Sequence, residues 1–325
     1  MTGPYRILGR SAPIEELRRQ VEAIAPTAAP VLLRGETGSG KSLVARVIHQ
    51  ESRRAAGPFV AFSAANLQEQ LFESELFGHM KGSFSGALGD HPGLARAADR
   101  GTLFLDEVGE LSAANQARLL RFLDTSEVRP VGSTRTWPVD VRVVSATNRT
   151  LDEDVRRQTF REDLFFRLNV VHLTVPPLRD RAGDLPILTG HFLATFCERH
   201  GKPVAGLTLE ARALLAQHQW PGNVRELANE VERAVVLTPA GEPIGPQHLS
   251  PRLRGPGGVA SDADPLARVR RQAERRLILE VLADTGWNVA AAARELRLSR
   301  VGLTKMLKRL GVARPESSGT PSSPA

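Results

Sequence analysis

Short apolar segments alternate with helical patterns through the first 175 residues of this 325-residue chain. Continuous apolar runs, rather than strict alternation, favour strands that are buried on both faces of a parallel sheet. Such runs are PVLLRG (30–35), PFVAFS (58–63), GTLFLDE (101–107) and DVRVVSATN (140–148). Helical patterns lie between them, as in KSLVARVIHQ (41–50) and ANQARLLRFLD (114–124). This alternation predicts an α/β fold in which helices cover both faces of a parallel sheet.

The strand pattern ends after VVHLTVPPLRDR, and all-helical patterns follow. The helical segments are 184–200, 208–219 and 222–237, and a Pro/Gly/Ser-rich stretch comes after them. Further helical patterns then run to about Leu310. We therefore predict an α/β core at 1–175, a helical lid at 176–249, a linker at 250–264, a helical domain at 265–313 and a disordered tail at 314–325.

Composition and charge narrow the class of protein. Cys197 is the single cysteine, and no apolar run reaches the length of a membrane span, so we expect a cytoplasmic protein with no membrane partner. The net charge is +7, and residues 251–325 hold fourteen Arg and Lys against seven Asp and Glu. The basic excess therefore belongs to the C-terminal quarter, which indicates a nucleic-acid partner there. The alternative on charge alone is a basic, solvated face.

A phosphate-binding motif occupies residues 35–42, GETGSGKS. It follows a predicted strand and opens a predicted helix, which is the context that this motif requires. Backbone N–H groups of such a loop wrap phosphates, and the helix N-terminus adds a positive dipole end. Lys41 would reach the β- and γ-phosphates of ATP, and the Ser42 hydroxyl would bind Mg²⁺. The candidate nucleotide-binding residues are Gly35, Glu36, Thr37, Gly38, Ser39, Gly40, Lys41 and Ser42.

Polar residues that follow two further strands complete the predicted catalytic site. The strand at 101–107 ends in two carboxylates, of which Asp106 would hold Mg²⁺ and Glu107 would activate the attacking water. Asn148 ends the strand at 140–148 and could orient that water or contact the γ-phosphate. Arg161 and Arg167 lie on a partly apolar segment, where an arginine could stabilise the γ-phosphate of a neighbouring subunit. From spacing alone, two surface salt bridges are the simpler interpretation of these arginines.

The C-terminal segment NVAAAARELRLSRVGLTKMLKRLG (288–311) has the pattern of a helix, a turn and a second helix. Ala290 to Leu296 form the first helix, and Ser299 would N-cap the second. We expect an amphipathic helix at 274–285 that is suited to dimerisation. The candidate DNA-contacting residues are Arg300, Val301, Gly302 and Lys305 toward the major groove, with Lys308 and Arg309 near phosphates.

These stretches together resemble the bacterial enhancer-binding activators of sigma-54 RNA polymerase, a branch of the AAA+ ATPases. The resemblance runs from about Leu8 to Gly311 and ends in a Fis-type helix-turn-helix. It rests on GETGSGKS, ESELFGHMKGSFSGA, GTLFLDEVGEL, SATNRTL, FREDLFFRLNVV, PPLRDR and WPGNVREL.

The resemblance implies further roles for individual residues. Asn148 resembles the sensor I residue, and Arg161 and Arg167 resemble arginine fingers that are supplied in trans. Arg225 resembles sensor II on the lid, and Leu8 with Gly9 resembles the segment that walls the adenine. Members of this family form rings, usually hexamers, because each site is completed by its neighbour.

The loop GSFSGA resembles the segment that touches sigma-54 in this family, where it reads Gly-Ala-Phe-Thr-Gly-Ala. The implied contact residues are Gly82, Ser83, Phe84, Ser85, Gly86 and Ala87. Glycines would let the loop move, and the phenylalanine would supply apolar contact area. Serines replace the family's alanine and threonine in this loop. The chain departs from the family pattern at further positions, which are Ser63 for Asn, Met80 for a charged residue, Arg297 for Gly and Thr304 for an aromatic residue.

We therefore expect an ATP-hydrolysing activator that uses Mg²⁺, binds upstream double-stranded DNA and remodels sigma-54 RNA polymerase holoenzyme to open promoters. The alternative is a DNA-binding AAA+ regulator that has lost sigma-54 coupling and acts as a repressor or on other polymerase forms. The near-complete GSFSGA loop argues against this alternative. About eight residues precede the predicted ATPase core, with no sensory domain, so we expect regulation in trans or constitutive competence.

Overall fold

The computed structural model describes residues 4–65, 69–84, 87–254, 278, 281–282, 285 and 287–295. The chain divides into two compact units. The first combines Met1–Val204 with Ala216–Gly241, and the second combines Ala205–Leu215 with Glu242–Ala325.

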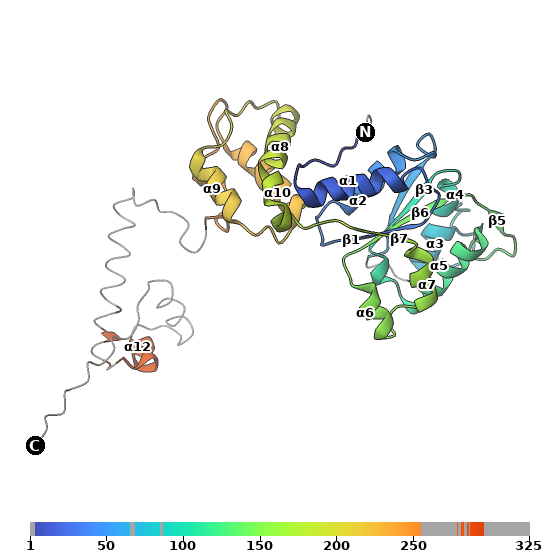
Figure 1. The fold of residues 1–325 in the computed structure, drawn as a ribbon. Helices are drawn as coiled ribbons and strands as arrows, with labels where there is room; N and C mark the ends of the chain where they lie inside the picture. The colour runs from blue at the N-terminus through green and yellow to red at the C-terminus, as the bar shows by residue number, and fades with distance from the viewer. Residues whose placement is uncertain are drawn as a thin grey trace, which may run out of the picture. The chain divides into compact units, whose positions relative to one another are not determined.

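A parallel sheet forms the centre of the first unit, and five of its strands lie in the described residues (Figure 1). Their order is β2-β3-β6-β1-β7, and every pairing between neighbours is parallel. Their bounds are Val31–Arg34 for β1, Phe59–Ser63 for β2, Thr102–Asp106 for β3, Arg142–Thr147 for β6 and Val171–Thr174 for β7. The carboxyl ends of parallel strands meet at one edge of a sheet, so the residues that follow β1, β3 and β6 come together there.

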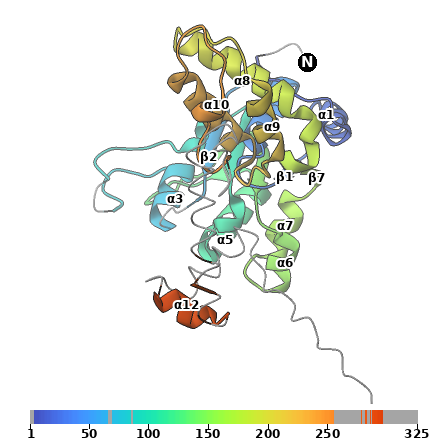
Figure 2. The ribbon, with the colours of Figure 1, turned by 90° about the vertical axis from the view of Figure 1, so that its left-hand side faces the viewer.

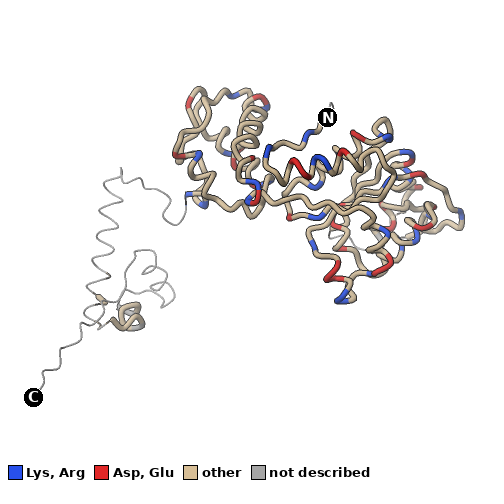
Figure 3. The backbone as a smooth tube through the Cα atoms, viewed as in Figure 1, with Lys and Arg blue, Asp and Glu red and all other residues tan. Residues whose placement is uncertain are grey.

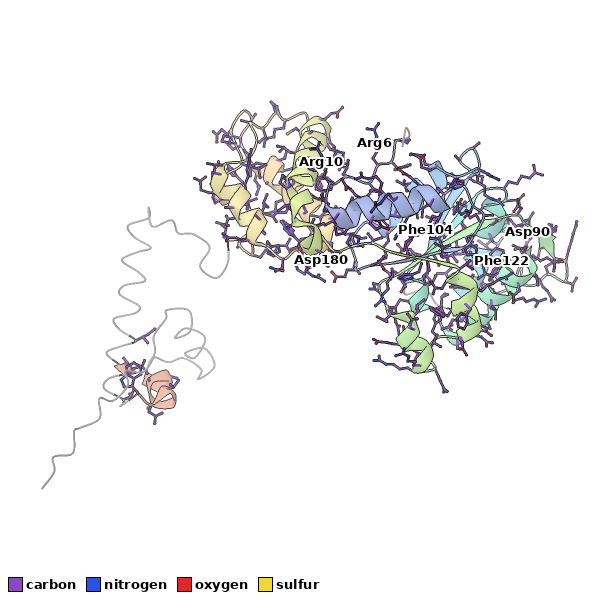
Figure 4. The ribbon with its side chains drawn as sticks, in the orientation of Figure 1. Arg6, Arg10, Asp90, Phe104, Phe122 and Asp180 are labelled. Atoms are coloured by element: carbon purple, nitrogen blue, oxygen red, sulfur yellow. The ribbon has the colours of Figure 1, made fainter. Side chains whose placement is uncertain are left out.

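Helices cover both faces of this sheet, and successive residues of β1 point into hydrophobic clusters on opposite faces. Val31 and Leu33 of β1 pack with α1 (Ala12–Ile24) and α2 (Lys41–Gln50). Leu32 belongs to the cluster on the opposite face, together with α3 (Glu69–Phe77), α5 (Ala113–Thr125) and α7 (Glu162–Leu168). Figure 2, turned from Figure 1, also shows α1 and α5 on different sides of the strands. Phe104 and Phe122, labelled in Figure 4, represent the two clusters. The predicted α/β fold with a parallel sheet is confirmed.

The first unit contains further elements between the strands of the sheet and a helical region that follows β7. They are α4 (Leu94–Ala97), η1 (Val108–Glu110), β4 (Glu127–Val128), β5 (Trp137–Pro138), α6 (Leu151–Arg156), η2 (Leu178–Asp184), α8 (Leu185–Arg199) and α10 (Asn223–Leu237). The antiparallel pair β4–β5 was not predicted, because strands of two residues carry no hydrophobic period. α8 and α10 pack against each other, which is consistent with the predicted helical lid.

The second unit contains α9 (Leu209–Gln217), which begins there, η3 (Pro246–His248) and α12 (Val289–Glu295). Ile278, Leu282, Ala292 and Ala293 form a small buried cluster. α12 lies where the first helix of the helix-turn-helix was predicted. The candidate DNA-contacting residues Arg300, Val301, Gly302, Lys305, Lys308 and Arg309 lie outside the described residues.

Charges of both signs are interspersed over the described part of the first unit (Figure 3). Most of the basic C-terminal quarter lies outside the described residues. In the part of the chain that the structure describes, no helix has the length and apolarity that a membrane crossing requires.

Candidate nucleotide site and partner loop

The phosphate loop connects β1 to α2, and its backbone depends on glycine. Gly40 directly precedes α2 with φ of 111°, and Gly38 has φ of 78°, a region that L-residues adopt at a cost. The buried Lys41 side chain points back into the loop. Its Nζ donates to the Gly35 carbonyl oxygen at 2.9 Å and lies 3.5 Å from Oε1 of Glu107. The positive charge of Lys41 therefore lies between the phosphate loop and the acidic end of β3.

The ends of β3 and β6 meet the phosphate loop. Asp106 Oδ2 lies 3.4 Å from the Ser42 hydroxyl, which donates to it. Asn148 donates its backbone N–H to Oε2 of Glu107 at 3.2 Å and its side-chain amide to Oγ1 of Thr37 at 3.3 Å. β6 lies between β1 and β3 in the sheet, so Asn148 bridges the phosphate loop and the carboxylates.

The two carboxylates differ from an ordinary surface pair. Burial raises the pKa of the Asp106 carboxyl, and the neighbouring Glu107 raises it further, while Lys41 acts in the opposite direction. Glu107 adopts φ of 55°, an unusual backbone conformation for a residue with a side chain. Such strain persists where the surrounding structure requires it, and it is common at functional sites.

Two adjoining cavities flank the phosphate loop. One, of about 470 Å³, is lined by loop residues together with Ser63, Asp106, Glu107 and Arg225. The other, of about 480 Å³, is largely apolar and includes Tyr5, Ile7, Leu8, Leu43 and Phe192 in its lining. Gly40, Leu43, Phe192 and Val224 line both cavities. A cavity lined by the phosphate loop and the two carboxylates, beside one that includes several large apolar side chains, suits the phosphates and the base of a nucleotide.

The N-terminal segment that carries Leu8 is held by a buried carboxylate. Asp184 accepts hydrogen bonds from the backbone N–H of Arg10 at 2.6 Å, and from the N–H and hydroxyl of Ser11 at 2.9 and 2.6 Å. Gly9 has φ of 139°, and a Cβ there would lie 2.5 Å from Asp184 Oδ2. Gly9 is therefore needed for the close approach to Asp184, while Leu8 lines the cavity itself. Figure 4 labels Arg6 and Arg10 on this segment.

A polar joint ties the phosphate loop to the helical region. Arg179 binds Glu36 through two hydrogen bonds of 2.9 and 2.6 Å, and the Asn223 amide donates to the same carboxylate at 3.1 Å. The Arg179 hydrogen bond, followed by that of Asn223, lowers the pKa of Glu36 to about 2. Arg225 contributes its backbone N–H to the Gly38 carbonyl oxygen at 3.2 Å.

Sequence reasoning missed several residues of these contacts. The missed residues are Arg179, Arg181, Asp184 and Asn223. Arg181 is buried and donates to the Ser39 carbonyl oxygen at 2.8 Å. Asn223 has φ of 53°, which is unusual for a non-glycine residue. The motifs PPLRDR and WPGNVREL contain three of these four residues. The sequence therefore marked these residues, but it did not show which residues they contact.

Arg161 and Arg167 lie apart from the phosphate loop's own contacts and are about half exposed. Arg161 forms two hydrogen bonds with Asp163, at 3.0 and 2.7 Å. Arg167 donates to the Leu123 carbonyl oxygen at 2.9 Å and lies 3.3 Å from Asp124. Within the described part of the chain, these arginines therefore make the surface salt bridges that their spacing suggested.

The loop GSFSGA follows α3 and is described up to Phe84 and again from Ala87, so Ser85 and Gly86 lie outside the described residues. The Gly82 N–H donates to the Ala87 carbonyl oxygen at 2.9 Å. Phe84 is 38% exposed, and its ring meets the ring of His79 edge-on. Leu88, directly after the loop, is 89% exposed.

Comparison with known proteins agrees with these sites. A family model described as the sigma-54 interaction domain matches residues 7–174, an AAA+ ATPase lid domain matches 179–264, and the Fis family of bacterial regulatory proteins matches 269–310. The transcriptional regulatory protein ZraR of Escherichia coli K12 is 46% identical over 308 residues, 94% of this chain and 69% of that protein. The response regulator protein PilR of Pseudomonas aeruginosa is 43% identical over 312 residues, 94% of this chain and 70% of that protein.

Solved structures of NtrX from Brucella abortus are similar over the same length. The complex with ADP superposes with a TM-score of 0.70 at 34% identity, covering 95% of this chain and 70% of that chain. The complex with ATP gives a TM-score of 0.69, also at 34% identity, covering 96% of this chain and 70% of that chain. The phosphate loop, the acidic strand end and the family matches lead to one conclusion. The chain belongs to the sigma-54-dependent transcriptional activators of the AAA+ family, and it is an ATP-hydrolysing, DNA-binding regulator of sigma-54 RNA polymerase.

Proposed function

We propose that Lys41, Asp106, Glu107 and Asn148 carry out the ATP hydrolysis of this activator. The observation that carries the proposal is their convergence at the carboxyl edge of the sheet, within hydrogen-bond or ion-pair distance of one another or of the phosphate loop. Lys41 would leave its contact with Glu107 for the β- and γ-phosphates. Glu107, released from that contact, would accept a proton from the attacking water, and Asn148 would hold the carboxylate in place.

Ser42 and Asp106 supply the oxygen ligands that Mg²⁺ prefers, and they lie next to the loop that would hold the phosphates. Among the described residues, no cluster of three or more His, Cys, Asp or Glu forms a separate metal site. Mg²⁺ would therefore be held by these two side chains with phosphate oxygens and water. When bound, the ion would neutralise charge on the transferred phosphoryl group.

Arg161 and Arg167 would act on the nucleotide of a neighbouring subunit in a ring, as in hexamers of this family. Their exposure supports this role, and Phe166 between them is 64% exposed, an apolar side chain that a subunit contact would cover. Arg225 would read the nucleotide from the lid, since it is among the residues that line the cavity beside the phosphate loop. Leu8 would contact the base from the apolar cavity.

The coupling of hydrolysis to polymerase would pass through residues 82–87, with Phe84 as the apolar contact to sigma-54. The Fis-type segment would bind upstream DNA and, by helix pairing, bring subunits together. We also propose that a separate regulator acts on this chain in trans. The competing function is a DNA-binding AAA+ regulator without sigma-54 coupling.

The ATPase test uses two variants of the full chain. Lys41→Ala should abolish ATP binding, and Glu107→Gln should keep binding while turnover falls at least a hundredfold, because the general base is lost. Substantial turnover by Lys41→Ala would contradict the site. Transcription from a test promoter with and without sigma-54 separates the two functions, since the competing function predicts no dependence on sigma-54.

A further inference from the structure

The phenylalanine of the partner loop is not fully presented to solvent. Its ring centroid lies 5.0 Å from that of His79, at an interplanar angle of 69°, and the side chain is 38% exposed. An edge-on arrangement at this distance is a favourable aromatic pair. Leu88, by contrast, is 89% exposed in the same segment. Phe84 therefore occupies a defined resting position rather than projecting freely.

His79 is itself held firmly, so it can serve as a support. Its Nδ1 forms a 2.7 Å hydrogen bond with the hydroxyl of the buried Ser74 of α3. Its backbone exchanges two hydrogen bonds with His91, at 2.9 and 2.8 Å, and the two imidazole rings lie 5.5 Å apart. The His79 ring is thus fixed by its own backbone and by α3, while Phe84 reaches it from the loop.

The base of the loop is also closed around this position. Gly82 adopts φ of 79°, and its N–H donates to the Ala87 carbonyl oxygen. Ser83 packs against the turn between β4 and β5, where a Cβ on Gly132 would lie 2.7 Å from the Ser83 Cβ. The Met80 N–H donates to the Val131 carbonyl oxygen at 3.0 Å. The Ala87 N–H also donates to the Phe84 carbonyl oxygen at 3.1 Å. The loop base is therefore anchored on both sides, and the packing of the Phe84 ring on His79 is the side-chain contact that must break for the ring to move.

We propose that His79 is a positioning residue that holds Phe84 in a resting state, from which Phe84 must be released before it can engage sigma-54. The proposal rests on the proposed contact between residues 82–87 and sigma-54. The same aromatic surface cannot pack on His79 and on the partner at once, so the two contacts compete. A resting state that competes with binding lowers the apparent affinity for sigma-54 by the factor by which the contact with His79 favours the resting state. An aromatic pair of this kind changes an equilibrium constant by about 2- to 12-fold.

The test measures the affinity of fluorescently labelled sigma-54 for the full chain, first with ADP and then with ADP–aluminium fluoride. The ratio of the two dissociation constants reports how strongly the nucleotide controls the loop. His79→Ala should lower this ratio about 2- to 12-fold by tightening the complex with ADP, with ATPase turnover unchanged. His79→Phe keeps an aromatic ring under Phe84 and should restore the ratio of the parent chain.

Further variants separate the possible outcomes. Ser74→Ala removes the hydrogen bond that orients the ring and should give an intermediate ratio, which decides the matter if His79→Ala does not fold. An unchanged ratio in both His79→Ala and Ser74→Ala would overturn the resting-state proposal. Phe84→Ala should prevent binding with either nucleotide. If Phe84→Ala binds sigma-54 like the parent chain, the underlying loop contact fails instead.

Discussion

The ion pair between Glu36 and Arg179 joins residues 143 positions apart and links the phosphate loop to η2. A shift of the Glu36 pKa from 4.5 to about 2 corresponds to at most roughly 3.4 kcal/mol at about 1.36 kcal/mol per unit. Both side chains are 42% exposed, so solvent screening reduces the expected pair energy to about 1 kcal/mol. We predict a coupling free energy of about this size between Glu36→Gln and Arg179→Met.

The assay is urea unfolding at pH 7.5, followed by tryptophan fluorescence, for both single variants and the double variant. The matched control is the exposed pair of Arg157 and Glu153, with N and O atoms 3.6 Å apart, for which we expect about 0.3–0.5 kcal/mol. Because the Glu36 pKa is lowered on folding, its contribution is present above pH 4.5 and is lost as the pH falls toward 2. Coupling no larger than that of the control pair would show that the joint does not stabilise the chain.

Three further predictions concern the nucleotide site. Gly38→Ala should weaken ATP binding at least tenfold in a titration, because Gly38 has φ of 78° and the added Cβ would lie 2.3 Å from the Gly222 carbonyl oxygen. The control Gly190→Ala, whose Cβ would meet no atom within 4 Å, should leave ATP binding unchanged. In the chain without Mg²⁺ and nucleotide, Asp106 should take up its proton at a higher pH than an ordinary aspartate, because burial and the neighbouring Glu107 raise its pKa. A carboxyl carbon NMR resonance of Asp106 that titrates at or below the ordinary aspartate range would contradict this. Asp184→Ala should lower the free energy of unfolding by about 1–3 kcal/mol and weaken ATP binding, because it leaves the hydrogen-bond donors of the N-terminal segment unpaired. A variant with the unfolding free energy and the ATP affinity of the parent chain would exclude this role.

The features that the sequence predicted best are local in the chain. GETGSGKS contains its own turn, and the apolar strand before Asp106 and Glu107 fixes where those carboxylates emerge. The order of the strands could not be read from apolar runs, although it explains why Asn148 reaches both Thr37 and Glu107. Hydrophobic periodicity was therefore enough to predict the fold class. Predicting the contacts within the site also requires knowing that β6 lies between β1 and β3 in the sheet.

The contacts that the sequence could not predict join distant segments. Glu36 belongs to a recognisable motif, but nothing nearby shows that its partners are Arg179 and Asn223. The sequence predicted that glycines let the loop move and that Phe84 supplies contact area, but it did not predict that the Phe84 ring packs on His79, five residues earlier, or that Ser74 of α3 holds that imidazole. Side-chain pairing of this kind depends on the path of the loop, which glycine and serine content alone does not determine.

The most direct test of ATP-driven coupling to polymerase is binding of the purified chain to sigma-54 in the presence of ADP–aluminium fluoride. We predict a stable complex that is absent with ADP at the same concentration and that Phe84→Ala abolishes while ATPase turnover persists. A chain that hydrolyses ATP and binds DNA but forms no complex with sigma-54 in this state would contradict the proposed role of the loop.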